Sequence, residues 1–361
     1  MRVTIRILDN LIMKLSKNIR LVIVLLAVQS SWLASSSQDL HFSQFFDSPL
    51  LTNPANTGFL PSGDYRLGVN YRNQWASITA FPYKTMSAFG DVQVMPNQDN
   101  TGWLGVGGVI LRDVAGTGTL TSTKLYGSVA YHQMVDQGSL VSLGFNVGWV
   151  NKNINTNNLT FPSQWNGKFF DVDNKAAAPK LDANNINYLD MQVGMNYAYF
   201  TEGSLYLNAG FSALHVNRPK ESFFNAVPGI NNRVPVRYTA FLNGSFMPND
   251  RWIINPNIYA SYQAKSYEIV GGLNAHYNLS GDGEKILIAG VYYRYKDALI
   301  PMVGLGFKDY TVTFNYDATT SSLKDFNNTR GAFEISIIKN GVLDKYNGNK
   351  RDAMCPSFKS Y

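Results

Sequence analysis

Apolar residues alternate one by one with small or polar residues along many segments of this chain. In residues 203–215, for example, Leu205, Leu207 and Phe211 alternate with tyrosine, asparagine, glycine and serine. A period of two places successive side chains on opposite faces of a β-strand, whereas a helical face needs apolar residues three or four positions apart. The alternation therefore predicts strands with one apolar face and one polar face.

Fourteen segments show this pattern, and the connections between them alternate in length. The predicted strands are 64–72, 84–94, 103–111, 120–132, 139–152, 187–199, 203–215, 236–246, 251–264, 267–278, 284–295, 300–307, 309–317 and 330–338. Tight turns at 135–138, 201–203, 248–250, 280–283 and 308–309 alternate with connections that are mostly longer, at 73–83, 112–119, 153–186, 216–235 and 318–329. Short turns at one end and long loops at the other are typical of outer-membrane barrels. We predict an all-β fold, a transmembrane antiparallel β-barrel of the outer-membrane type over residues 64–338, in a Gram-negative bacterium.

The amino-acid composition agrees with β-strands that face lipid on one side and water on the other. Charged residues make up 16% of the chain, below the quarter or so of soluble proteins, and there are 21 tyrosines and 21 phenylalanines. A β-sandwich would also alternate, but it would not require turn lengths to alternate. Nor would it require aromatic residues such as Tyr292 and Tyr295 at strand ends, where a membrane barrel has its interfacial girdle. These features together favour the barrel.

The first 37 residues have the features of a secretory signal peptide. Five cations and one anion precede Leu21, an apolar run extends from Leu21 to Val28, and Ser35 to Ser37 supply small residues for cleavage. The apolar run is shorter than the roughly 20 residues that a membrane helix needs. Removing residues 1–37 leaves 26 cationic and 24 anionic side chains, so the net charge falls from +6 to +2. We therefore expect no binding to nucleic acid.

The sequence contains no recognisable catalytic, cofactor or metal motif. The four histidines are scattered, and the glycine-rich stretch 102–108 is not followed by the Lys-Ser/Thr of a phosphate-binding loop. No G-x-S-x-G elbow is present, and the single cysteine, Cys355, excludes an internal disulfide framework. We expect a protein without enzymatic activity, cofactor or metal, surrounded by outer-membrane lipid.

Several polar residues lie on or beside predicted strands, where a lipid-facing position would not tolerate them. These candidate site residues are Arg66, Arg72, Asn73, Gln74, Trp75, Arg294, Asp297, Asp317 and Glu334. Arg72 is in phase with Arg66, so both side chains are predicted to point into the lumen. Inward charges can form salt bridges that hold the barrel or a plug, or they can line a selective pore. The sequence leaves both interpretations open.

Two further segments flank the predicted barrel. Residues 38–63, with turns at Pro49 and Asn53-Pro54, are rich in phenylalanine and leucine, and we predict that they pack in the periplasmic mouth as a plug. Residues 339–361, which include Cys355, extend beyond the last predicted strand. We predict that they form a periplasmic tail that contacts a partner.

Motifs in these segments, taken in order, resemble the PorP/SprF family of outer-membrane proteins of the Bacteroidetes type IX secretion system. The matching stretches include 38–45, 53–55, 70–75, 294–298, 316–317, 330–336 and 355–356. The run Asn-Tyr-Arg-Asn-Gln-Trp at 70–75 and the late Cys355-Pro356 are specific, and Ser357 departs from the arginine that the family prefers. The resemblance implies a role in the export or surface attachment of large adhesins and other cargo with a sorting domain. It further implies type IX secretion components as partners and, for some members, a role in gliding motility.

A diffusion channel for small solutes is the alternative function, because inward charges suit a pore as well as a plug. The apolar segment 38–63 and the long tail favour a closed, partner-bound barrel. An outer-membrane enzyme is the third possibility, and it lacks the residue constellations that catalysis needs.

Overall fold

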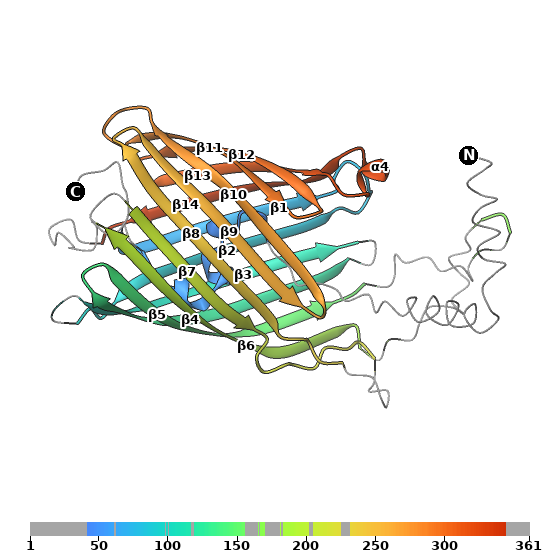
Figure 1. The fold of residues 1–361 in the computed structure, drawn as a ribbon. Helices are drawn as coiled ribbons and strands as arrows, with labels where there is room; N and C mark the ends of the chain where they lie inside the picture. Colours follow the sequence, from blue (N-terminus) through green and yellow to red (C-terminus); the bar gives the residue numbers. More distant parts are fainter. Residues whose placement is uncertain are drawn as a thin grey trace, which may run out of the picture. The chain divides into compact units, whose positions relative to one another are not determined.

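The alternating segments pair in chain order, and the last strand closes on the first (Figure 1). In the computed structural model of the chain, β1 (Tyr65–Gln74) and β14 (Arg330–Gly341) are antiparallel neighbours, with Arg72 opposite Glu334. Closure removes the sheet edges, so the backbone groups of the wall can pair within the sheet, as a lipid environment demands. The predicted antiparallel barrel is confirmed, with fourteen strands.

The structure describes residues 42–60, 63–97, 99, 101–116, 119–155, 165, 167–169, 181, 183–201, 205–224 and 232–343. The strands between β1 and β14 are β2 (Tyr83–Val94), β3 (Gly102–Ala115), β4 (Leu120–Asp136), β5 (Ser139–Asn153), β6 (Asn185–Thr201), β7 (Leu205–Leu214), β8 (Arg237–Asn249), β9 (Trp252–Gln263), β10 (Ser266–Asn278), β11 (Lys285–Arg294), β12 (Ala298–Phe307) and β13 (Tyr310–Thr319). The predicted signal peptide, residues 1–37, and Cys355 lie outside the described residues. The wall ends at Gly341 rather than at 338, because the last residues of β14 keep pairing with β1.

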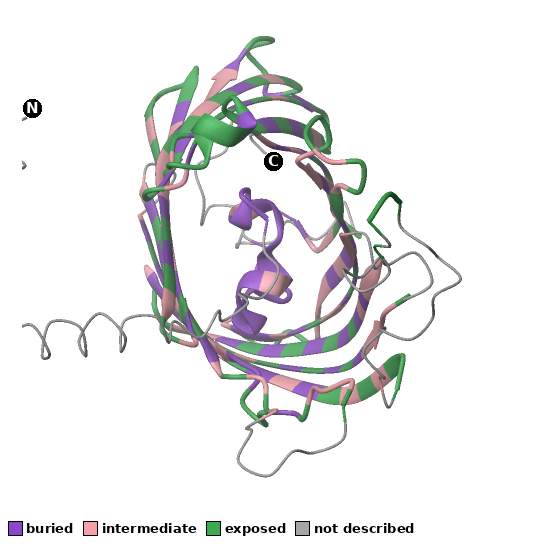
Figure 2. Cartoon of the chain, turned by 90° about the vertical axis from the view of Figure 1, so that its right-hand side faces the viewer, coloured by how far each residue is buried: buried purple, intermediate pink, exposed green. Residues whose placement is uncertain are grey.

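Each strand presents one face to the lumen and one to the outside, which gives the alternating colours of Figure 2. On β6, Leu189 and Met195 are more than half exposed on the outer face, whereas Asp190 and Asn196 are buried on the inner face. A barrel wall in lipid needs this arrangement, with apolar side chains outward and polar or small ones inward.

The two ends of the barrel differ in their connections. At one end, which we call the turn end, strands are joined by short links such as residues 137–138 and 308–309, and β1 begins and β14 ends there. The other end, the loop end, carries the long connections 154–184 and 215–236. The loop-end connection at 264–265 has only two residues, both with positive φ, as a tight hairpin turn requires.

Residues 42–60 fold inside the lumen, and we call them the plug (Figure 2). The plug forms three short helices, η1 (Phe45–Asp47), α3 (Pro49–Thr52) and η2 (Pro54–Asn56). Pro49 and Pro54 each occupy a first helical position, where the missing N–H costs no hydrogen bond. The Asn53 side chain caps η2 by accepting a hydrogen bond from the Ala55 N–H at 2.8 Å. In the described part of the chain, no helix is long and apolar enough to cross a membrane.

The plug supplies a residue to each of three apolar clusters in the lumen. Phe45 stacks on Tyr259 of β9 in the first cluster, with ring centres 5.1 Å apart. Phe59 belongs to the second cluster, with Trp103 of β3. Leu50, which is completely buried, belongs to the third. The core of this barrel is therefore formed jointly by plug and wall.

The plug passes along the lumen from one end to the other. Ser43 contacts Asp317 near the loop end of β13, whereas Gly58 contacts Asp91 near the turn end of β2. The sequence-based prediction placed this segment in one mouth of the barrel, the periplasmic one, whereas the plug extends along the lumen as far as the loop end. The physical reason is that the polar groups at the start of the plug have their charged partners at the loop end.

The alternation of turns and loops predicts which end of the barrel faces outside the cell. An epitope tag inserted in the β5–β6 connection should be labelled on intact cells, because long loops face outward in barrels of this type. A matched tag at the β8–β9 turn, between Asp250 and Arg251, should be labelled only after the outer membrane is opened. The reverse labelling pattern would show that the orientation is wrong.

Candidate functional site

Four charged side chains from different strands meet around Ser43 of the plug. Arg72 Nη1 lies 3.0 Å from Asp317 Oδ2 and also contacts Glu334. Arg294 Nη2 lies 3.0 Å from the same Asp317 oxygen. All four side chains are less than a tenth exposed. We call Arg72, Arg294, Asp317 and Glu334 the charge cluster.

The plug supplies hydrogen-bond partners to this cluster. The Ser43 hydroxyl accepts hydrogen bonds from Arg72 and Arg294 and donates one to Asp317 Oδ2 at 2.8 Å, which uses its whole bonding capacity. The backbone N–H groups of Ser43 and Gln44 donate to the two carboxylate oxygens of Glu334, at 2.7 and 3.1 Å. The start of the plug is therefore held by both side-chain and backbone bonds.

Arg294 extends the cluster sideways along the wall. Its Nε lies 3.4 Å from Glu268 of β10, and its Nη1 lies 2.9 Å from Asp297, whose side chain is 47% exposed. Burying ions is favourable only when they are paired and hydrogen-bonded, and removing one partner of a buried pair costs about 3–5 kcal/mol. Removing any member of the cluster, or its contacts with the plug, should therefore destabilise the protein.

The middle of the plug is held by Asn53. Its side-chain amide donates to the carbonyls of Met195 and Phe211, at 3.1 and 3.2 Å, and to Asn196 Oδ1 at 2.8 Å. The adjacent Thr52 carbonyl accepts hydrogen bonds from Ser212 and Thr239. These bonds connect the plug to β6, β7 and β8.

Two inward glycines make room for the turn that Asn53 and Pro54 form. A Cβ atom at Gly144 of β5 would overlap the backbone of Pro54 and Ala55. A Cβ atom at Gly194 of β6 would overlap the Asn53 side chain. Glycine is therefore required at both positions because the plug approaches the wall too closely for any side chain.

The far end of the plug is held near the turn end. Asp91 accepts a hydrogen bond from the Gly58 N–H at 2.8 Å. It also forms a bidentate ion pair with Arg66, with Nη2 2.8 Å from Oδ2 and Nε 3.1 Å from Oδ1. The Trp103 indole N–H donates to the Gly58 carbonyl at 3.0 Å, and His132 Nε2 lies 2.8 Å from the Thr57 carbonyl. Polar contacts thus fix both ends of the plug as well as its middle.

The other candidate residues lie beside the charge cluster rather than in it. Gln74 accepts a 3.5 Å hydrogen bond from Arg72, and Asn73 occupies an outward position opposite Lys84. Trp75 has a φ of 60° and packs edge-on against Tyr83, directly after β1 ends. Cys355 lies outside the described residues.

Sequence reasoning missed several residues that contact the plug or the charge cluster. Asp91 could have been found, because it is a charged residue at an inward position of a predicted strand, as Arg72 is. Glu268 shows the same signal on β10. Ser43 gave no signal, since a serine in an irregular segment is ordinary, and its role depends on which charges the folded wall brings to it.

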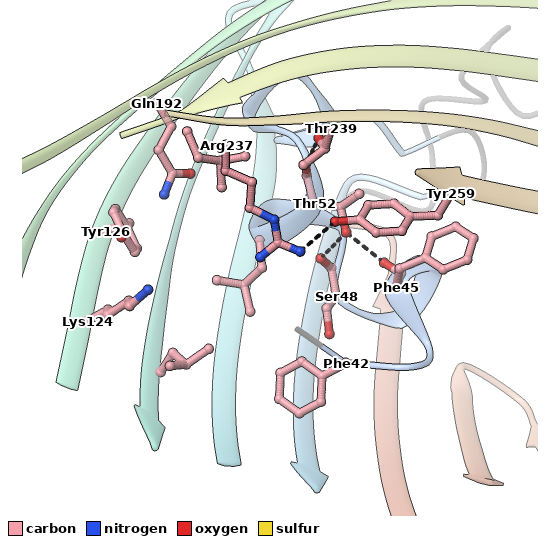
Figure 3. A pocket seen from close by; sticks show the side chains of 13 residues that line it. Phe42, Phe45, Ser48, Thr52, Lys124, Tyr126, Gln192, Arg237, Thr239 and Tyr259 are labelled. Carbon is pink, nitrogen blue, oxygen red and sulfur yellow. Dashed lines mark hydrogen bonds between the residues drawn. The ribbon is translucent and has the colours of Figure 1, made fainter. Parts of the chain in front are cut away.

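A small space remains between plug and wall in the loop half of the lumen (Figure 3). Lys124 and Arg237 point into it from the wall, beside Phe42 of the plug. Arg237 donates a hydrogen bond to the Tyr259 hydroxyl at 3.0 Å. Among the described residues, no group of three or more histidine, cysteine or acidic side chains could hold a metal ion.

The arrangement thus defines a class of protein, an outer-membrane type of β-barrel whose lumen is occupied by a segment that precedes its first strand. The sequence profile of the type IX secretion system membrane proteins PorP/SprF matches residues 34–338. The chain belongs to the PorP/SprF family, as its motifs indicate.

Solved structures similar to this chain include two toluene transporters and a FadL homologue. The toluene transporter TbuX of Ralstonia pickettii is 12% identical, with a TM-score of 0.49 over 82% of this chain and 94% of that one. The toluene transporter TodX of Pseudomonas putida is 13% identical, with a TM-score of 0.49 over 82% and 95%. A FadL homologue of Pseudomonas aeruginosa is 11% identical, with a TM-score of 0.47 over 81% and 94%. A search of curated proteins gave no match.

The close approach at Gly144 can be tested by a single methyl group. Gly144→Ala should lower the free energy of unfolding by about 1–3 kcal/mol, because the methyl overlaps plug backbone that cannot move freely. The matched control is Gly127→Ala on the neighbouring strand β4, where the nearest atom to an added Cβ is 4.0 Å away. Urea unfolding of the purified barrel measures both, and equal midpoints would contradict the close contact.

Asp47, in the plug and outside the membrane-spanning strands, makes the stability dependent on pH. Burial raises the pKa of its carboxyl from 3.8 to about 7, with nearby Glu334 adding to the rise and the Thr313 hydrogen bond and Arg66 opposing it. A raised carboxyl pKa means that the folded protein binds the proton more tightly. The stability that Asp47 contributes is therefore complete below pH 3.8 and is lost as the pH rises to about 7, by about 1.4 kcal/mol per pH unit.

Asp47→Asn should remove this dependence, because the amide is neutral at every pH and can still accept the Thr313 hydrogen bond. Urea midpoints at pH 5.5 and pH 8 should differ more in the wild type than in the variant. Identical pH dependence in the two proteins would show that Asp47 does not take up the proton.

Proposed function

We propose that this protein is a closed, non-enzymatic barrel in the outer membrane of a Gram-negative bacterium. It assists type IX secretion, or the surface attachment of large adhesins and other cargo with a sorting domain, and it serves gliding motility where that process depends on such adhesins. The single observation that carries this proposal is membership of the PorP/SprF family over residues 34–338. Its partners are type IX secretion components and the exported cargo.

The way the plug is fixed supports a role without transport through the lumen. Ser43, Asn53 and Gly58 each bond to different strands, so moving the plug out of the lumen would require breaking contacts at three separate places. The charge cluster adds to this barrier, because withdrawing Ser43 would leave buried charges with unfilled hydrogen bonds.

A closed lumen directs the contacts with partners to the ends and outer face of the barrel. At the loop end, Glu221 pairs with Lys152 at 2.6 Å and accepts a 2.6 Å hydrogen bond from Tyr188, which fixes part of the 215–236 connection to the wall. At the other end, we propose that the tail containing Cys355 docks on a periplasmic partner.

The proposal can be tested by deleting the gene and comparing the secreted and surface proteomes with those of the parent strain. We expect a loss of sorting-domain cargo from the surface, restored by the wild-type gene. Gly127→Ala is a control that should restore it fully, because its added methyl meets no atom closer than 4.0 Å. Unchanged surface and secreted proteomes, combined with impaired uptake of a small solute, would overturn the proposal in favour of a diffusion channel.

A further inference from the structure

On the described strands, the cationic side chains of the outer face lie near the two ends of the barrel. Lys84 of β2 and Arg112 of β3 occupy outward positions near the loop end, and Lys285 of β11 and Lys339 of β14 occupy outward positions near the turn end. The outward positions of β14, β1, β2 and β3 contain no aspartate or glutamate. The pair near the loop end therefore has no acidic neighbour on the face of the wall that meets lipid.

An apolar hollow lies directly beside this pair, on the outer face of β14, β1, β2 and β3. Its lining includes Val69, Met86, Ala88, Ile110, Ile335 and Ile337, with Arg112 at its margin. Its volume is about 440 Å³, within the range of roughly 300–1,000 Å³ that is usual for small-ligand sites. The outward side chains of the lining are apolar apart from Arg112 and the hydroxyl group of Tyr71, and the inward Asn70 and Ser87 complete it.

The strand register explains why the hollow exists. Ala88 stands between Val69 on β1 and Ile110 on β3 in one row across the sheet. The small Ala88 side chain lowers the surface of the wall at this point, while the larger side chains around it form the rim.

The same register places both cations above the hollow. Arg112 lies opposite Met86, and Lys84 is two residues farther along β2 on the same face, nearer the loop end. A ligand that fits here has an apolar chain for the hollow and a negatively charged group for the two cations. Arginine suits phosphate in particular, because its guanidinium group can donate two parallel hydrogen bonds.

We propose that this hollow binds one acyl chain of a phosphorylated lipid, whose phosphate lies on Arg112 and Lys84. Because the loop end faces the outer leaflet in the orientation predicted above, we assign the ligand to lipid A of the lipopolysaccharide. An acyl chain gains little from leaving other lipid tails, so the phosphate contacts select the lipid and the hollow positions its chain. The site is independent of the role in secretion.

The test is native mass spectrometry of the detergent-purified barrel, with phosphorylated lipid A added at a fixed ratio. We expect Lys84→Gln combined with Arg112→Gln to reduce the lipid-bound fraction at least fivefold. The matched control, Lys285→Gln combined with Lys339→Gln, removes the same charge at the turn end and should bind like the wild type. Ala88→Leu should also reduce binding by filling the hollow, whereas Ala289→Leu, on the outer face of β11, should not.

Two further probes distinguish lipid A from other sources of phosphate. Dephosphorylated lipid A should bind no better to the wild type than to the double glutamine variant, and phosphatidylethanolamine should bind more weakly than phosphorylated lipid A. Equal binding of phosphatidylethanolamine would overturn the assignment to lipid A. Undiminished binding by both the double glutamine variant and Ala88→Leu, each shown to be folded by heat-modifiable gel migration, would overturn the site itself.

Discussion

A wall of fourteen strands encloses more space than its own inward side chains can fill, and the rest of this structure follows from that constraint. The plug occupies part of this space and adds Phe45, Leu50 and Phe59 to the apolar clusters formed by the wall. The plug backbone then brings polar groups into a region from which bulk water is largely displaced. Those groups need partners, which explains why inward positions carry asparagine, serine and charged residues rather than only small ones.

The charge cluster shows how the cost of buried charge is offset. Arg72, Asp317 and Glu334 come from three strands that adjoin at the seam where the barrel closes, and Arg294 reaches them past β12. Any one of these ions alone in the lumen would be strongly unfavourable. These ions are paired with one another and hydrogen-bonded to the Ser43 hydroxyl, so the same atoms stabilise the seam and the position of the plug.

The fold was predictable from the sequence because the period of two and the alternating turn lengths are local signals that report the architecture directly. The inward orientation of Arg72 and Arg66 could be predicted for the same reason, since it depends only on strand phase. Which charges meet could not be predicted, because Arg294 finds Asp317 across an intervening strand and the Ser43 contact spans more than 270 positions. The path of the plug along the lumen was missed on the same grounds. It depends on partners that only the closed barrel assembles.

The strand that carries Glu334 is the last in the chain, whereas Ser43 and Gln44 stand before the first strand. During synthesis and export the plug therefore emerges long before the carboxylate that receives its N–H groups. Ser43 reaches its full set of bonds only when β14 has paired with both β13 and β1. The plug is consequently fixed in this position only after the barrel has closed. A chain that lacks β14 cannot form the full set of plug contacts.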